Sequence, residues 1–105
     1  MSVEMGITNK RTGEYRTVPV ATLQAFRDYW LPASKALGLR LVSRLQDGSL
    51  TTVETEQIPV IVDELKRLRA SVVDRQEYVG IIARIDGILQ TFETTDSAES
   101  EYDFG

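Results

Sequence analysis

The sequence predicts an α+β domain, in which helices pack on a small antiparallel sheet, followed by an acidic C-terminal tail. Two patterns lead to this fold class. Short segments that mix apolar and polar residues flank turn signals in two places, as the strands of β-hairpins do. Three longer segments repeat apolar residues at the helical period. The expected order is ββαββαα, with about four strands in two hairpins and three helices, and 105 residues suit one domain.

The first hairpin is predicted from the segment VEMGITNKRTGEYRTV. Its two apolar-containing runs flank NKRTG, in which Gly13 can adopt the positive φ that such a hairpin loop often needs. We therefore expect strands near residues 3–8 and 14–18.

A helix over residues 19–38 is expected next. Its apolar residues share one face: Leu23, Phe26, Trp30, Ala33 and Leu37. Pro19 suits the first turn, and Gly38 suits the end of the helix. Pro32 removes one backbone donor and crowds the preceding turn, so we expect a kink there, or two short helices that meet. Trp30 lies at the centre of the apolar face, which favours a place in the core over a stacking role.

The segment LRLVSRLQDGSLTTV predicts a second hairpin. Leucines alternate with polar residues in its first half, and Asp47-Gly48 is a strong signal for a tight turn. The expected strands cover residues 39–46 and 49–54.

The next segment has the helical period again. Its apolar residues are Ile58, Ile61, Val62, Leu65 and Leu68. They predict a helix over residues 56–70, with Thr55 as its N-cap. The adjacent carboxylates of Asp63 and Glu64 project away from the apolar face, and we interpret both as solvated.

The last helix is expected over residues 75–93, where apolar residues again line one face. Asp74 and Glu77 precede this run in a pattern typical of a capping box. Capping and the favourable helix dipole explain both carboxylates without a metal ion.

The opposite face of this helix carries a small-residue strip, which consists of Gly80, Ala83 and Gly87. Each glycine inside a helix costs about 1 kcal/mol relative to alanine. The strip therefore either lies exposed or permits a close approach by the tail or by a second copy of the chain.

The net charge of −4 is concentrated at the C-terminus. Residues 1–93 hold 12 basic and 12 acidic side chains, whereas residues 94–105 hold four carboxylates and no Lys or Arg. Within the first range, residues 1–46 carry a net charge of +4 and residues 47–93 a net charge of −4. We therefore divide the chain into a domain (1–93) and an acidic tail (94–105). The uneven charge either marks a partner surface or arises by chance.

The tail ends in EYDFG, which places two aromatic residues among acids. In an extended chain, Tyr102 and Phe104 would project to one side and Asp103 to the other. We expect the rings to dock on an apolar patch and the carboxylates to lie near cations, in the same molecule or a second copy; a solvated tail is the alternative. The candidate cations are Arg11, Arg16, Arg40 and Arg44.

The chain contains no histidine and no cysteine. Disulfides, imidazole and thiolate metal ligands, and the nucleophile–base pairs of most hydrolases are thereby excluded. The glycines form no phosphate-binding loop. We expect no catalytic residues, no cofactor and no tightly bound transition metal.

The chain has no apolar run near the roughly 20 residues that span a bilayer. Its start, MSVEMGITNK, resembles no secretory signal, so we expect a cytoplasmic protein without a membrane partner. The overall acidity also argues against nucleic acid as a partner.

These observations favour a non-catalytic protein–protein interaction module of the regulatory, accessory or inhibitor type; one specific version is an inhibitor of a basic partner. One alternative is a structural, self-assembling subunit that forms a homodimer through the helix at residues 75–93. A further alternative is an enzyme that depends on carboxylates alone.

Overall fold

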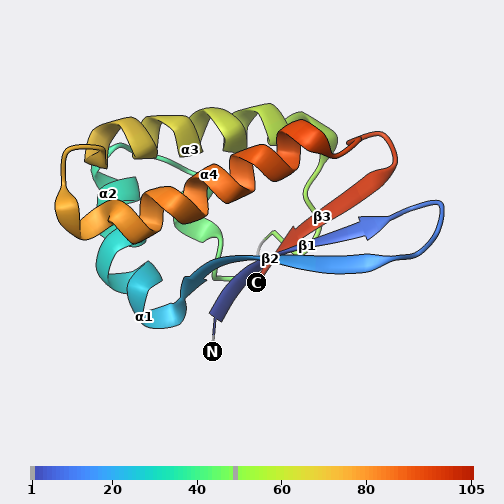
Figure 1. Ribbon diagram of the computed structural model, residues 1–105, viewed down its shortest axis with the longest axis horizontal. Helices are drawn as coiled ribbons and strands as arrows, with labels where there is room; N and C mark the ends of the chain where they lie inside the picture. Colours follow the sequence, from blue (N-terminus) through green and yellow to red (C-terminus); the bar gives the residue numbers. More distant parts are fainter. Residues whose placement is uncertain (1, 49) are drawn as a thin grey trace.

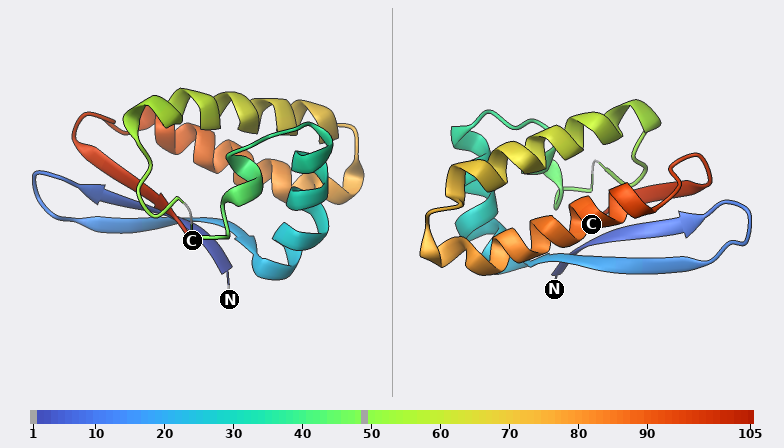
Figure 2. Two further views of the ribbon diagram at one scale, coloured as in Figure 1. Left: turned by 180° about the vertical axis from the view of Figure 1, so that it is seen from behind. Right: turned by 45° about the horizontal axis from the view of Figure 1, so that its top comes forward.

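The computed structural model describes residues 2–48 and 50–105. Within these residues, helices cover one face of a three-stranded antiparallel sheet (Figures 1 and 2). The strands are β1 (Ser2–Asn9), β2 (Tyr15–Thr22) and β3 (Ser100–Phe104). The helices are α1 (Leu23–Ala25), α2 (Leu31–Ala36), α3 (Ile58–Val72) and α4 (Val79–Thr94). The α+β class is confirmed, but the predicted four strands and the order ββαββαα are wrong, because the third strand follows the helices.

The strand order is β2-β1-β3, and β1 is antiparallel to both neighbours. The first predicted hairpin is confirmed, with strands longer than expected. Gly13 has a φ of +76° in its turn, the left-handed conformation for which glycine is suited. On β1, the buried residues Val3, Met5 and Ile7 point toward the helices, and the residues between them face the other side of the sheet.

The first helix begins at residue 23 rather than at residue 19. Pro19 lies in β2, opposite Glu4 of β1. Because β2 is an edge strand, it tolerates a residue without a backbone N–H. The N-cap of α1 is Thr22, whose hydroxyl accepts a hydrogen bond of 3.0 Å from the N–H of Ala25.

A π-helical turn (Phe26–Trp30) joins α1 to α2, directly ahead of Pro32. Here the N–H of Leu31 donates to the carbonyl of Phe26, a bond one residue longer than in an α-helix. The distortion lies where the proline predicts it. Trp30 is fully buried, so its predicted place in the core is confirmed.

The second predicted hairpin is wrong. Residues 39–46 form turns and a short 3-10 helix (Val42–Arg44), and residues 50–54 form no strand; Ser49, where the second predicted strand begins, lies outside the described residues. The buried apolar residues of the first half are Leu39, Val42 and Leu45. A spacing of three suits tight helical turns, whereas in a strand it would send successive side chains to opposite faces.

The two long helices, α3 and α4, agree with the predicted helices within a few residues. A 3-10 turn precedes each one, and the residues at the cap positions of these turns are Glu54 and Arg75 rather than Thr55 and Asp74. Glu77 instead pairs with Arg75 at 3.0 Å. A hydrogen bond from its own backbone N–H, followed by the one from Arg75, lowers the pKa of the Glu77 carboxyl.

Glu64 is not solvated, contrary to the sequence interpretation. Its side chain is 5% exposed, and Oε1 accepts hydrogen bonds from the backbone N–H groups of Leu41 (3.0 Å) and Val42 (2.9 Å). This carboxylate thus ties the irregular segment after α2 to the middle of α3. Asp63, its neighbour, is exposed as expected.

Candidate interaction surface

β3 comes from the segment that the sequence analysis set apart as a tail. It pairs with β1 so that Tyr102 lies opposite Ile7 and Phe104 opposite Met5. Tyr102 is 2% exposed and Phe104 is 1% exposed, and the ring of Tyr102 lies 4.9 Å from that of Phe92 on α4. The segment therefore docks within the molecule, as a strand whose rings complete the core. The predicted boundary between residues 93 and 94 stays a prediction.

The second edge of β3 is also occupied. The N–H of Val53 donates to the carbonyl of Tyr102, and the N–H of Phe104 donates to the carbonyl of Leu50, each at 2.8 Å. These two bonds hold residues 50–53 against the sheet without forming a regular strand. β3 is thus fixed from both sides, although it is only five residues long.

The four candidate arginines lie in different places. Arg16 projects from β2 on the helix side, and its guanidinium donates to the hydroxyl of Thr95 at 3.1 Å. Arg11 lies in the turn of the hairpin, and Arg40 and Arg44 lie in the segment between α2 and α3. Among the described residues, no ion pair joins any of them to a carboxylate of residues 94–105.

The buried hydroxyl of Tyr102 has no hydrogen bond of ordinary geometry, although the side chain of Thr95 lies near enough to act on its pKa. Burial is the main cause that raises its pKa, and the positive charge of Arg16 opposes this shift. Arg16 thus influences the hydroxyl of Tyr102 in the docked segment.

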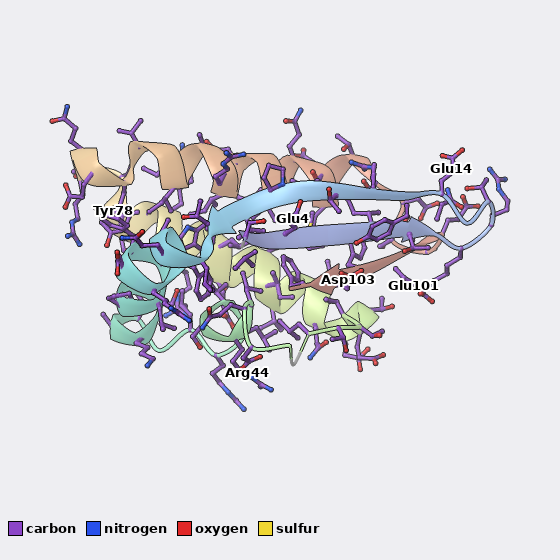
Figure 3. The ribbon with its side chains drawn as sticks, turned by 90° about the horizontal axis from the view of Figure 1, so that it is seen from below. Glu4, Glu14, Arg44, Tyr78, Glu101 and Asp103 are labelled. Carbon is purple, nitrogen blue, oxygen red and sulfur yellow. The ribbon has the colours of Figure 1, made fainter. Side chains whose placement is uncertain are left out.

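The outer face of the sheet is not covered by helices (Figure 3). The residues that alternate with the buried ones on the three strands form this outer face: Glu4, Gly6, Thr8, Tyr15, Thr17, Pro19, Glu101 and Asp103. It contains three carboxylates and neither Lys nor Arg. None of the three carboxylates has an ion-pair partner within residues 2–48 and 50–105. The outer face is thus an anionic surface.

Gly6 lies at the middle of the outer face, between Thr17 of β2 and Asp103 of β3. A Cβ placed on Gly6 would lie 2.5 Å from the hydroxyl oxygen of Tyr15 and 2.5 Å from Oδ2 of Asp103. The two side chains therefore converge above the glycine. A larger residue at position 6 would displace at least one of them.

Asp103 is partly buried by this arrangement. Burial alone raises the pKa of its carboxyl, and no nearby cation opposes the shift. The folded state holds the proton of Asp103 more tightly than the unfolded state does. The free energy of unfolding therefore falls as the pH rises from the pKa of Asp103 in the unfolded chain to its higher pKa in the folded chain. At neutral pH the folded chain thus carries a carboxylate in an unfavourable environment.

The small-residue strip of α4 is uncovered. Gly80 and Ala83 are exposed and Gly87 is half-buried. A Cβ added to either glycine would meet nothing within 4 Å. The tail does not lie on the strip, so the strip remains open to another molecule.

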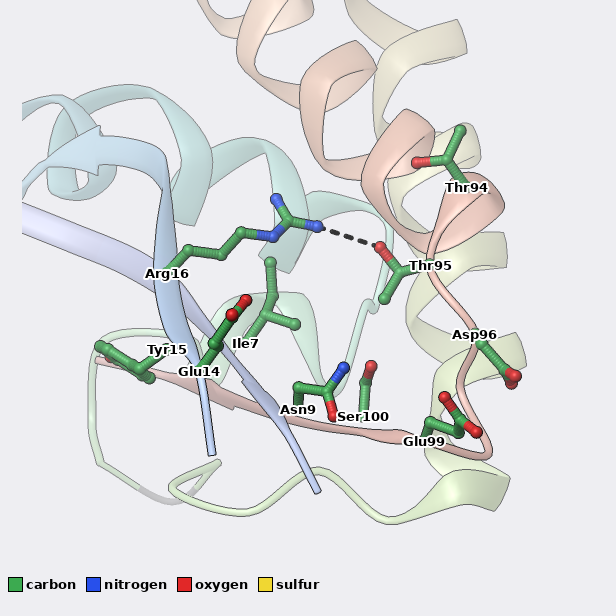
Figure 4. A pocket seen from close by; sticks show the side chains of 10 residues that line it. All are labelled: Ile7, Asn9, Glu14, Tyr15, Arg16, Thr94, Thr95, Asp96, Glu99 and Ser100. Atoms are coloured by element: carbon green, nitrogen blue, oxygen red, sulfur yellow. Dashed lines mark hydrogen bonds between the residues drawn. The ribbon is translucent and has the colours of Figure 1, made fainter. Parts of the chain in front are cut away.

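A polar pocket of about 320 Å³ lies between the hairpin and the loop from α4 to β3 (Figure 4). Arg16 extends across it to Thr95, and the carboxylates of Glu14, Asp96 and Glu99 lie around its rim. Of the residues of the outer face, Tyr15 also lines this pocket, at the edge of β2. The pocket contains no paired nucleophile and base.

The described part of the chain has no group of three or more Asp or Glu side chains placed to hold a metal ion. None of its helices is long and apolar enough to cross a membrane. No protein-family model, curated protein or solved structure matches the chain.

Of the residues of the outer face, only Asp103 was a candidate from the sequence; Glu4, Gly6 and Tyr15 are among those that sequence reasoning missed. A signal for Glu4 was present, because it alternates with the apolar residues Val3 and Met5 in a predicted strand. Tyr15 could not be placed in the same way, because the side of the sheet on which it lies depends on the register between β2 and β1.

Proposed function

We propose that the protein is a non-catalytic interaction module, of the regulatory, accessory or inhibitor type, that binds a basic protein through the outer face of its sheet. One observation carries the proposal: this face is free of helices and holds three carboxylates with no cation among them. A sheet face without a packed layer offers a flat, rigid surface for a partner. A cationic partner would supply the charge that the chain itself does not place there.

Asp103 and Tyr15 form the expected centre of the contact. Tyr15 is 60% exposed although it is aromatic, and such residues commonly anchor interfaces. A Lys or Arg of the partner beside Asp103 would relieve the unfavourable burial of its carboxylate. The flanking carboxylates of Glu4 and Glu101 would mainly speed the encounter with a basic protein.

The first test uses a fluorescent oligolysine peptide as a minimal basic probe. Replacing Glu4 and Glu101 by Gln, and Asp103 by Asn, should weaken its binding at low salt by about ten-fold, because three favourable charge contacts of modest strength are lost. Titration at two salt concentrations measures both the affinity and its expected decrease with ionic strength.

A second variant with the same change in net charge is the control. It carries Glu56→Gln, Asp63→Asn and Glu93→Gln, three exposed positions on the helical side of the molecule. This control should bind the peptide almost as tightly as the parent chain. If both variants lose affinity equally, net charge alone attracts the peptide and the outer face is not a binding surface.

The small-residue strip supports a second candidate function, a homodimer through α4. The observation that favours it is the open space above Gly80 and Gly87, two glycines that each cost the helix about 1 kcal/mol relative to alanine. A second copy of the helix could approach closely there.

The Gly80→Leu and Gly87→Leu variants test this candidate, because leucine has a much higher helix propensity. Each is expected to raise the melting temperature of the monomer slightly and to lower the mass measured by sedimentation at high protein concentration. If the mass of the parent chain equals that of a monomer, or if neither variant changes it, the dimer is excluded.

A further inference from the structure

A second groove lies at the opposite end of the molecule from the hairpin turn, where the end of β2 and the first helix meet the start of α4 (Figure 1). Its volume is about 320 Å³, near the lower limit for small-molecule sites. Its walls are largely apolar and include Val20, Ala25, Tyr29 and Ile81. Neither the acidic outer face nor the pocket of Figure 4 shares these residues.

Trp30 also lines this groove, and its indole N–H is buried without a hydrogen-bond acceptor. The side chain is fully buried in the described structure. An unpaired buried donor is unfavourable and rare in folded proteins. Because the N–H is covered, an acceptor that enters the groove can satisfy it only if the neighbouring side chains move aside.

The other polar groups of the groove are mainly donors. Arg84 lies at the rim and has no ion-pair partner within the described residues. The hydroxyl of Thr22 already accepts a bond from Ala25 N–H, and its own proton is free to be donated. Glu77 is the exception, and its carboxylate is already paired with Arg75. A ligand should therefore carry acceptors and a negative charge.

Gly80 keeps the groove open. It is one of the lining residues, and a Cβ built there would meet nothing within 4 Å. A large side chain at this position would extend into the space that a ligand needs. Gly87 lies two turns further along the same strip and does not line the groove.

We propose that this groove binds a small carboxylic acid with an apolar body. The carboxylate pairs with Arg84 and accepts the hydrogen bond from the indole N–H of Trp30. The apolar body packs on Val20 and Ile81 beside the open position at Gly80. The site is independent of the basic partner proposed for the outer face.

The tryptophan itself reports on the site, because the chain contains only one. In a ¹⁵N-labelled protein its indole N–H gives a single resonance, which shifts downfield when it gains an acceptor. Phenylacetate is the probe, and millimolar affinity is expected for a ligand of this size. Phenylacetamide, which has the same shape and no charge, should bind about two- to five-fold more weakly because it lacks the ion pair with Arg84.

Two pairs of variants make the test specific. Gly80→Leu should abolish the shift of the indole resonance, whereas Gly87→Leu should leave it unchanged. Arg84→Met should weaken binding of phenylacetate about two- to five-fold and remove its preference over the amide, whereas Arg67→Met, at an exposed position on α3, should do neither.

Three results would overturn the proposal. The first is the absence of a saturable shift with phenylacetate and with isovalerate, a branched acid. The second is an equal shift in the Gly80→Leu variant. The third is an indole resonance that moves with protein concentration alone, which would make a second copy of the chain the occupant of the groove.

Discussion

The Phe104→Ala variant is expected to have a free energy of unfolding about 3–5 kcal/mol lower than that of the parent chain. Phe104 is 1% exposed, lies opposite Met5 in the sheet and is held at the edge by its hydrogen bond to Leu50. Removing the ring of Phe104 leaves a cavity in the core, at the place where β3 covers it. Since domains of this size are stable by about 5–15 kcal/mol, the loss is a large part of the total. Urea unfolding followed by circular dichroism measures it.

Tyr102 offers a matched pair of variants for the same strand. Tyr102→Ala removes a buried ring and should destabilise the fold about as much as Phe104→Ala. Tyr102→Phe removes only a hydroxyl without a well-formed hydrogen bond, with Thr95 as its one polar neighbour, so stability should change little. If Phe104→Ala and Tyr102→Ala both lose less than about 1 kcal/mol, β3 does not hold the core together in solution.

The role of the last residues could be predicted in part. The alternation of rings and acids in EYDFG correctly indicates that Tyr102 and Phe104 share one face. The partner of this strand could not be predicted, because β1 lies at the other end of the chain and many residues separate the two. Local patterns do not determine such a long-range pairing.

The second hairpin shows where a local signal fails. Asp47-Gly48 and the alternating leucines fit a hairpin, and Gly48 does adopt a positive φ of +79°. Both edges of β1 are occupied, by β2 and β3. The segment instead buries apolar residues at a spacing of three and passes along the outside of β3. Tertiary packing thus decides against the turn propensity.

The anionic outer face was not predicted from the sequence, which expected the carboxylates of the last residues to lie near Arg or Lys. The sequence placed Asp103 among the candidate residues, and the structure adds Glu4 and Tyr15 from the first hairpin. Glycine at position 6 was not singled out, although it is what lets Tyr15 and Asp103 meet. A close approach between three strands is visible only once their register is known.

The second large change in stability is expected at Glu64, a residue that the sequence analysis interpreted as solvated and that the structure buries. The Glu64→Ala variant is expected to lower the free energy of unfolding by about 2–5 kcal/mol, because two backbone N–H groups lose their acceptor at roughly 1–3 kcal/mol each. The affected donors are Leu41 and Val42, and Val42 is fully buried. No other acceptor for them is present in the described residues. The segment after α2 should then detach from α3 before the rest of the fold unfolds.

The neighbouring carboxylate provides the control for this experiment. Asp63→Ala removes the same charge one residue away on an exposed surface and should change stability by less than about 0.5 kcal/mol. Glu64→Gln keeps an acceptor oxygen but loses the negative charge that strengthens both hydrogen bonds. Its decrease in the free energy of unfolding should therefore lie between those of Asp63→Ala and Glu64→Ala. Urea unfolding ranks the three variants, and hydrogen exchange at Leu41 and Val42 shows whether the segment opens first. Equal stability of Glu64→Ala and Asp63→Ala would mean that water replaces the carboxylate, and that the buried apolar residues of the segment hold it in place.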